Sequence, residues 1–171
     1  FKDIGLLGGP NKSIDNEIEV IKSRKIIEGV IKNLDLNIYY YSEGRIKETE
    51  TYKKSPAKLN FISKAEDFYE IGTSFVITVM SDTEFKLSDV SKSEGRLYKF
   101  GQVIADNLGV YKIDYNPQSK YDEVTVKMVN IKNLIGQYRS RISIEAVSKR
   151  SSVLRISIKD RVRQKAEEFL D

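Results

Sequence analysis

Cysteine and histidine are both absent from this chain of 171 residues. Without cysteine the chain can form no disulfide and offers no thiolate, so its sequence is compatible with either a reducing or an oxidising compartment. Without histidine it lacks the most common general base and the most common metal ligand of proteins. The two absences remove much of the usual chemistry of enzymes and metal sites.

Long apolar runs and a strong net charge are also absent. No apolar stretch approaches the roughly 18–20 residues of a membrane-spanning helix. The 29 basic and 25 acidic residues leave a net charge of only +4. This small excess is weak evidence for a polyanionic partner, and a surface of mixed charges explains it better. With 40% hydrophobic and 32% charged residues, the composition is that of a globular domain large enough to bury a core.

No motif for catalytic or cofactor chemistry is complete. Residues 8–13 end in the Lys-Ser pair of a phosphate-binding loop, but Asn11 occupies the position of the second glycine and Pro10 lacks a backbone N–H. The paired carboxylates follow no calcium-loop spacing, and most have Lys or Arg nearby, as on a solvated surface. Basic residues are frequent over residues 149–165, but almost no aromatic residues accompany them. We therefore predict no catalytic residue, no metal, no cofactor and no nucleic-acid partner.

Residues 15–36 carry the clearest helical pattern, which extends for about six turns. Ser13 or Asp15 is the expected N-cap. The apolar positions of this segment form two stripes that are out of phase by about two residues. We therefore expect either a kink or two consecutive helices at Ser23-Arg24, with Ser23 as a second cap.

The periodicity changes to that of β-strands after residue 36. Residues 37–42 and 45–52 flank Glu43-Gly44 and predict a hairpin. Further strands are expected at residues 58–63, 74–80, 85–87, 96–100, 110–114, 121–129, 141–147 and 152–158. Short helices are expected at residues 131–138, capped by Asn130, and at residues 161–170, capped by Asp160. The predicted fold is α+β, with a mixed β-sheet of roughly five to seven strands packed against a long N-terminal helix and one or two shorter helices.

Three consecutive tyrosines offer a candidate contact for sugars. On a strand, Tyr39 and Tyr41 share one face of the sheet and Tyr40 lies on the other. An exposed aromatic pair could stack on a sugar ring, so Tyr39 and Tyr41 are candidate glycan contacts. Tyrosine is also favoured in strands generally, and packing within the sheet explains the same pattern.

Three segments, in order along the chain, resemble the chain-length determinant (Wzz-type) domain of bacterial polysaccharide co-polymerases. The first, within residues 16–36, contains Asn-Glu-Ile-Glu, Ile-Lys-Ser-Arg and Val-Ile-Lys-Asn-Leu-Asp-Leu. The second, residues 51–59, reads Thr-Tyr-Lys-Lys-Ser-Pro-Ala-Lys-Leu, and Glu50-Thr51 stands in place of the family's Glu-Leu. The third, residues 151–160, reads Ser-Ser-Val-Leu-Arg-Ile-Ser-Ile-Lys-Asp, and Arg163 follows where the family usually has proline.

The resemblance implies a single base domain over residues 1–171 that belongs to a longer protein of the bacterial inner membrane. Such domains are extracytoplasmic (periplasmic) and lie between two membrane-spanning helices. The proteins form ring-like homo-oligomers and regulate the chain length of capsular polysaccharide or exopolysaccharide made by a separate polymerase and export machinery. Residues 5–9 and 98–101 look most like the members that carry a cytoplasmic tyrosine autokinase, to which any ATP chemistry would belong.

The resemblance thus favours assembly, not catalysis, as the role of this chain. In a head-to-tail ring, one surface of each subunit meets a different surface of the next. The candidate interface residues are the polar residues of the expected N-terminal helix: Glu17, Glu19, Lys22, Arg24, Lys25 and Glu28. The same residues would also suit a surface that simply faces water. A glycan-binding module and a periplasmic adaptor that contacts a polymerase or export channel are the alternative functions.

Overall fold

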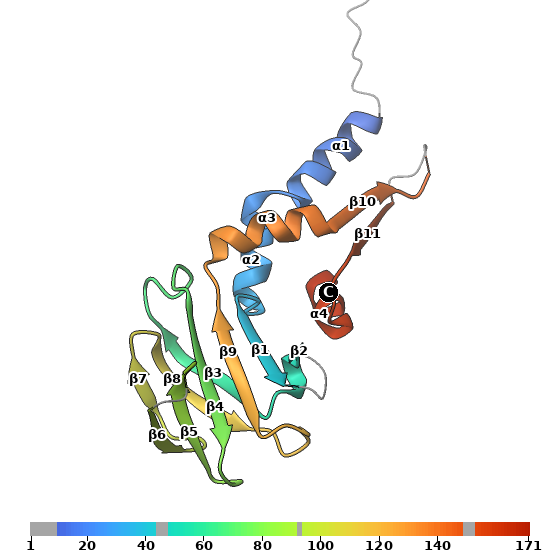
Figure 1. Ribbon diagram of the computed structural model, residues 1–171. Helices are drawn as coiled ribbons and strands as arrows, with labels where there is room; N and C mark the ends of the chain where they lie inside the picture. The colour runs from blue at the N-terminus through green and yellow to red at the C-terminus, as the bar shows by residue number, and fades with distance from the viewer. Residues whose placement is uncertain (1–9, 44–47, 92–93, 149–152) are drawn as a thin grey trace, which may run out of the picture. The chain divides into compact units, whose positions relative to one another are not determined.

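The computed structural model describes residues 10–43, 48–91, 94–148 and 153–171 (Figure 1). These residues form eleven β-strands, four α-helices and one short 3-10 helix. The chain divides into two compact units, of which one comprises residues 35–133 and the other residues 1–34 together with 134–171. We call them the β unit and the helical unit.

The larger sheet of the β unit has six strands in the order β2-β1-β9-β4-β5-β6. Each pair of neighbours in this sheet is antiparallel. The strands are β1 (Ile38–Glu43), β2 (Glu48–Glu50), β4 (Thr73–Val79), β5 (Glu84–Asp89), β6 (Gly95–Lys99) and β9 (Glu123–Met128).

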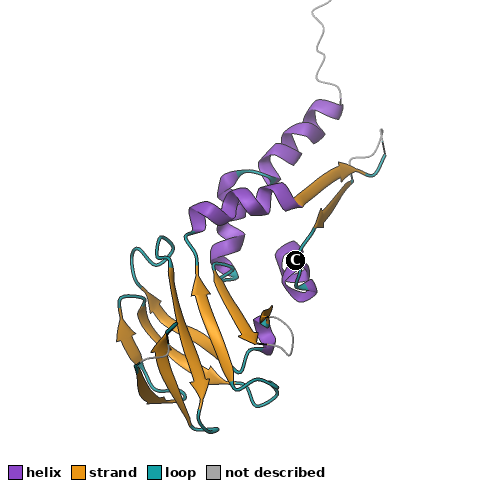
Figure 2. Ribbon diagram, viewed as in Figure 1, coloured by secondary structure: helices purple, strands orange, loops and turns teal. Residues whose placement is uncertain are grey.

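The smaller sheet of the β unit has three antiparallel strands in the order β3-β8-β7. They are β3 (Ala57–Lys64), β7 (Ile104–Asp106) and β8 (Gly109–Tyr115), and the 3-10 helix η1 (Tyr52–Lys54) precedes β3. The strands of the β unit lie in two layers (Figure 2).

The core of the β unit lies between these two sheets. Alternate residues of each strand point inward, as in Val124, Val126 and Met128 of β9, which are at most 1% exposed. Tyr40 of the larger sheet is also buried, and its hydroxyl accepts a hydrogen bond from the Leu59 N–H of the smaller sheet at 3.2 Å. This bond satisfies a polar group inside the core and links the two layers.

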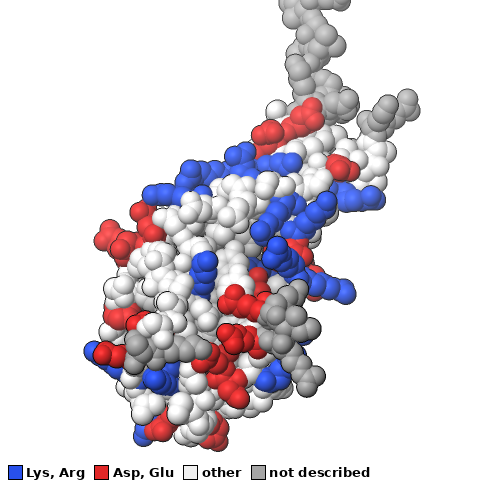
Figure 3. Space-filling model, viewed as in Figure 1, with Lys and Arg blue, Asp and Glu red and all other residues white. Residues whose placement is uncertain are grey.

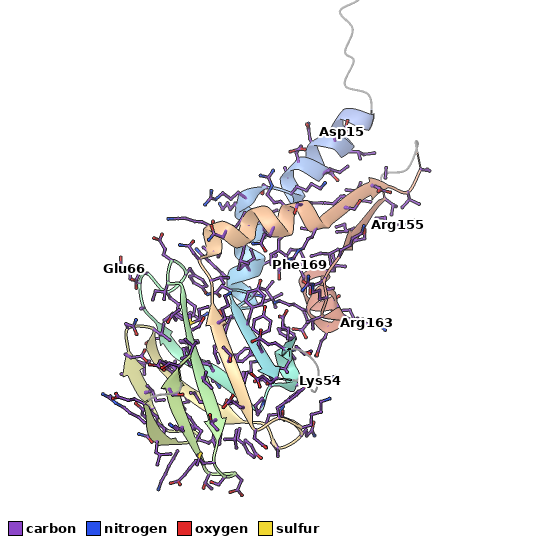
Figure 4. All side chains as sticks on the ribbon, in the orientation of Figure 1. Asp15, Lys54, Glu66, Arg155, Arg163 and Phe169 are labelled. Carbon is purple, nitrogen blue, oxygen red and sulfur yellow. The ribbon has the colours of Figure 1, made fainter. Side chains whose placement is uncertain are left out.

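The helical unit contains four helices and a β-ribbon. The elements are α1 (Pro10–Ile21), α2 (Arg24–Asn33), α3 (Ile131–Arg141), β10 (Ile142–Ala146), β11 (Leu154–Ile158) and α4 (Arg163–Leu170), and the first turn of α3 belongs to the β unit. Phe169 of α4 stacks on Tyr138 of α3, with ring centroids 4.9 Å apart and planes 9° from parallel (Figure 4). None of the helices in the described residues has the length and apolar character that a membrane span needs.

The expected α+β class is wrong, because the described residues form a β-rich fold with eleven strands in three sheets and four short helices. Two details of the expected fold are wrong as well. First, the sheets in the described residues are antiparallel and not mixed. Antiparallel neighbours can be joined by short turns, whereas a parallel pair needs a crossover of a dozen or more residues. Second, no long N-terminal helix is present, because α1 and α2 are separate short helices.

The break between α1 and α2 lies where the two apolar stripes change phase. The Ser23 side chain accepts a hydrogen bond from the Ile26 N–H at 3.4 Å and is the N-cap of α2. The Asn130 side chain likewise accepts from the Lys132 N–H at 2.9 Å at the start of α3. These two predicted caps are confirmed, and so is the pairing of β1 with β2, although residues 44–47 of the expected hairpin lie outside the described residues.

Two other predicted caps are wrong. Helix α1 begins at Pro10, so Ser13 and Asp15 lie inside it; proline suits a first helical position because it has no N–H to satisfy. The N-cap of α4 is Val162, and Asp160 instead accepts a hydrogen bond from the Val162 N–H and pairs with Arg141 at 3.3 Å. The cap signals were present, but each helix begins a few residues from where they placed it.

Candidate functional site

The six candidate interface residues lie on two helices and the link between them. Glu17 and Glu19 are exposed on α1, and Arg24 and Lys25 are exposed in the first turn of α2. None of these four side chains forms a salt bridge with another described residue. On the face shown in Figure 3, acidic atoms lie over α1 and basic atoms gather over the helices next to it. This surface therefore carries charges of both signs that form no salt bridge within the described part of the chain.

The other two candidate residues are more constrained. Lys22 is half-buried in the link between the helices. Glu28 pairs with Lys32 one turn further along α2 at 2.7 Å. The hydrogen bond from Lys32, opposed by partial burial, holds the pKa of the Glu28 carboxyl below its usual value. Glu28 thus already forms an ion pair within its own helix, so it is a weaker candidate for an ion pair with a partner than Arg24 or Lys25.

The candidate glycan contacts, Tyr39 and Tyr41, lie on the outward face of the six-stranded sheet. Their cross-strand partners on β9 are Lys127 and Thr125. The two rings stand parallel, with centroids 6.0 Å apart and planes 5° from parallel. Both side chains are half-buried, so only part of each ring surface is exposed.

A cleft of about 430 Å³ opens on the other side of the six-stranded sheet, within the β unit. The floor and one wall come from β4, β5 and β6. On this side of the cleft Phe75 pairs with Asp89, and Leu87 pairs with Arg96. Directly paired residues point to the same face of a sheet, and Leu87 also packs against the core. The charged Arg96 and Asp89 therefore share the face that elsewhere is apolar.

The opposite wall is the turn between β7 and β8. Asp106 pairs with Gly109, which leaves Asn107 and Leu108 as the two central residues of a tight hairpin. Gly109 has a φ of +122°, and a Cβ there would lie 2.3 Å from the backbone oxygen of Ser63. Only glycine lets the turn approach β3 this closely. The close contact with β3 holds the β7–β8 turn, and with it this wall of the cleft, in position.

Asp106 is held in one orientation by two hydrogen bonds. Its Oδ1 accepts from the Leu108 N–H at 2.8 Å, and its Oδ2 accepts from the Tyr111 hydroxyl at 2.8 Å. Burial, with the hydrogen bond and the negative charge of Asp106, raises the pKa of the Tyr111 hydroxyl far above its usual value. Tyr111 therefore stays neutral and donates, and the Asp106 carboxylate keeps lone pairs for a further partner.

The floor of the cleft includes aromatic and aliphatic side chains. Tyr98 lines it, and the Tyr98 ring packs on Phe85 with centroids 5.8 Å apart and planes 21° from parallel. Phe75 and Leu87 line it beside Tyr98 and are half-buried. The site thus combines a rigid apolar floor with charged and amide groups at its walls, an arrangement typical of small-ligand sites.

Sequence reasoning missed this cleft. Residues 96–100 and 110–114 were expected to be strands, but the partner of each strand was not predicted. The local signal that could have indicated the hairpin was Asp106-Asn107-Leu108-Gly109, in which Asp, Asn and Gly favour a tight turn. No group of three or more acidic residues in the described part of the chain is arranged to hold a metal ion.

Comparison with models of known protein families and with curated proteins finds no match to this chain.

Proposed function

We propose that this chain is a non-catalytic assembly domain on the extracytoplasmic side of a bacterial inner-membrane polysaccharide co-polymerase. The single observation that carries the assembly role is the unpaired charge on the first two helices. Glu17 and Glu19 on α1 and Arg24 and Lys25 on α2 are exposed and lack ion-pair partners among the described residues. Opposite charges at different places on one subunit are suited to a head-to-tail contact, where they set register and orientation.

The resemblance to the Wzz-type domain supports the choice of family. Its first segment runs from the second half of α1 through α2 to the entry of β1, its second covers η1 and the start of β3, and its third includes β11 and ends between β11 and α4. Each segment therefore includes a junction between regular elements. In this proposal the full-length protein forms a ring that regulates polysaccharide chain length, acts with a separate polymerase or export machinery, and carries any kinase activity in another part.

The assembly role predicts a loss of oligomer when the basic pair is reversed. In the full-length protein, Arg24→Glu with Lys25→Glu would place four carboxylates on the surface that needs both signs, so neighbouring subunits would repel each other. We expect the ring to dissociate into smaller species while the fold is retained, because both side chains are exposed. Mass photometry of detergent-extracted protein and circular dichroism of the purified variant measure the two effects.

Two further variants serve as a control and as a rescue of the reversed pair. Lys53→Glu with Lys54→Glu makes the same change of charge at an exposed basic pair on η1 and should leave the oligomer intact. Adding Glu17→Lys and Glu19→Lys to the reversed pair restores opposite signs and should restore the ring. An oligomer that survives the reversal at Arg24 and Lys25 would exclude this helical surface as the contact.

A further inference from the structure

We propose that the cleft between the β5–β6 wall and the β7–β8 turn binds an uncharged saccharide. The cleft is a different site from the tyrosine pair on the outward face of the sheet, and no residue of the proposed assembly surface lines it. Its volume of about 430 Å³ is within the range of small-ligand pockets, roughly 300–1,000 Å³.

The cleft combines an apolar floor with polar walls. A sugar ring presents C–H groups on its faces and hydroxyl groups around its edge. The half-buried rings of Tyr98 and Phe75, with Leu87 beside them, supply a surface for the C–H face. Because Tyr98 already packs on Phe85, its ring is held in place before any ligand arrives, which lowers the entropic cost of binding.

The rim of the cleft carries both hydrogen-bond donors and acceptors. Arg96 offers only donors, Asp106 offers only acceptors, and Asn107 offers both, whereas Asp89 Oδ1 already accepts from the N–H and the hydroxyl of Ser91. A hydroxyl group donates and accepts at the same oxygen, so it can be satisfied by any of these neighbours. Asp106 is already oriented by Leu108 and Tyr111, and needs no reorganisation to accept another bond.

The charge of the cleft favours an uncharged ligand. Among the described residues, the lining of the cleft includes three acidic side chains, Asp89, Glu94 and Asp106, and one basic side chain, Arg96. An acidic sugar would be repelled by this excess of negative charge, whereas a neutral sugar would not. The cleft should therefore favour neutral residues of a glycan over uronic acids.

The residues that line the cleft indicate an uncharged saccharide as the class of ligand. That this saccharide is part of the polysaccharide whose length is regulated rests on the proposed function. In that setting the domain would contact the polymer directly as well as assemble.

The test uses the isotopically labelled 171-residue chain and amide chemical shifts. Separate titrations use the neutral hexasaccharides of maltose, cellulose and mannan, and the acidic hexamer of galacturonic acid. We expect at least one neutral probe to give saturable shifts at amides of β5, β6 and the β7–β8 turn, with galacturonate at least about tenfold weaker. Arg96→Ala should weaken the neutral probe about tenfold, the effect of losing a charged hydrogen bond.

The matched control is Lys99→Ala, which removes an exposed basic side chain from the same strand but outside the cleft lining. It should change affinity less than about twofold. The inference is overturned if no neutral probe saturates below about 10 mM, a weak limit for a single site. It is also overturned if galacturonate binds best, if the shifts centre on Tyr39 and Tyr41, or if Arg96→Ala has no effect.

The two proposals can fail separately. Saccharide binding is measured on the chain without its assembly, so the chain with Arg24→Glu and Lys25→Glu should bind the neutral probe as tightly as the unaltered chain. An intact oligomer in that variant would overturn the assembly surface and leave the cleft result standing.

Discussion

Lys64 illustrates how single residues of the β unit keep a charge in a half-buried position. Its ammonium group bonds Asp35 and the hydroxyl of Tyr69, the latter at 3.0 Å, and lies 5.2 Å from the ring centroid of Phe68. Burial alone would lower the pKa of the Lys64 amine, but the bonds to Asp35 and Tyr69 outweigh it and raise that pKa. The favourable contacts thus offset the loss of hydration, and Lys64 stays charged at neutral pH.

Replacement of Gly109 should lower the free energy of unfolding strongly, even when only one methyl group is added. Gly109→Ala would add a Cβ that meets backbone atoms of β3 at a backbone angle that L-residues rarely adopt. We expect the free energy of unfolding to fall by about 2 kcal/mol or more. Urea denaturation followed by fluorescence or circular dichroism measures the change.

The control for this prediction is Gly72→Ala. Gly72 is exposed, and a Cβ there would meet no atom within 4 Å. Its replacement should change the free energy of unfolding by less than about 1 kcal/mol. Equal effects of the two substitutions would contradict the close approach of the β7–β8 turn to β3.

At the scale of elements, the N-terminal region is two helices because its amphipathic pattern changes phase. A single straight helix would place the second apolar stripe on a different side from the first. With the break, the buried Ile27 and Ile31 of α2 can face inward although the stripe of α1 has another phase. Ser23 stabilises the break because its side chain replaces a hydrogen bond that the first turn of α2 lacks.

Ser23→Ala should therefore destabilise α2 by about 1 kcal/mol, the usual effect of losing an N-cap. Hydrogen exchange of the α2 amides should become faster, while exchange in β9 of the β unit should be unchanged. Ser23→Asp, which keeps an acceptor and adds a favourable charge at the helix start, should retain the protection. Faster exchange in Ser23→Asp as well would contradict the capping role.

The β10–β11 ribbon separates apolar and polar residues onto its two faces. Its register pairs Ile142 with Ile158 and Ile144 with Ile156, which places these isoleucines on one face and leaves polar pairs such as Glu145 and Arg155 on the other. Two strands alone are marginally stable in water, so burial of the apolar face is needed to hold them. Ile142 and Ile144 of β10 are 6% and 7% exposed, but Ile156 of β11 is 41% exposed, so this face is buried mainly on its β10 side.

At the scale of the whole molecule, the β unit contains a core of its own. The buried residues of that core all lie between Ile38 and Met128. The beginning and end of the unit are joined by a hydrogen bond from the Val129 N–H to the Asn37 carbonyl oxygen at 3.0 Å. The two ends of the unit therefore lie next to each other, as is typical of a domain that folds alone.

A chain of residues 35–133 should consequently fold without the helical unit. We expect a dispersed amide spectrum and a single cooperative unfolding transition. As a control, Val126→Asp places a charge in the core and should cost at least about 3 kcal/mol, which should unfold the shortened chain. A disordered 35–133 chain would show that the core depends on residues outside it.

Several features of this protein follow from residues that are close in the sequence. The change of phase near Ser23, the caps at Ser23 and Asn130, and the alternation of β9 depend on neighbours within a few residues. Such patterns fix the type of an element and its buried face, because helices and strands have fixed periods. They also indicated the charged residues of the proposed assembly surface.

Other features depend on contacts between residues far apart in the sequence. Strand β1 pairs with β9, whose residues lie more than 80 positions further along the chain, and β3 pairs with β8. The local pattern of Tyr39 or Val126 is the same whichever strand lies beside it, so the antiparallel order and the two-layer core could not be predicted. The cleft is of this second kind, since Arg96 and Asp106 share a lining only because long-range packing of two sheets brings β6 to the β7–β8 turn.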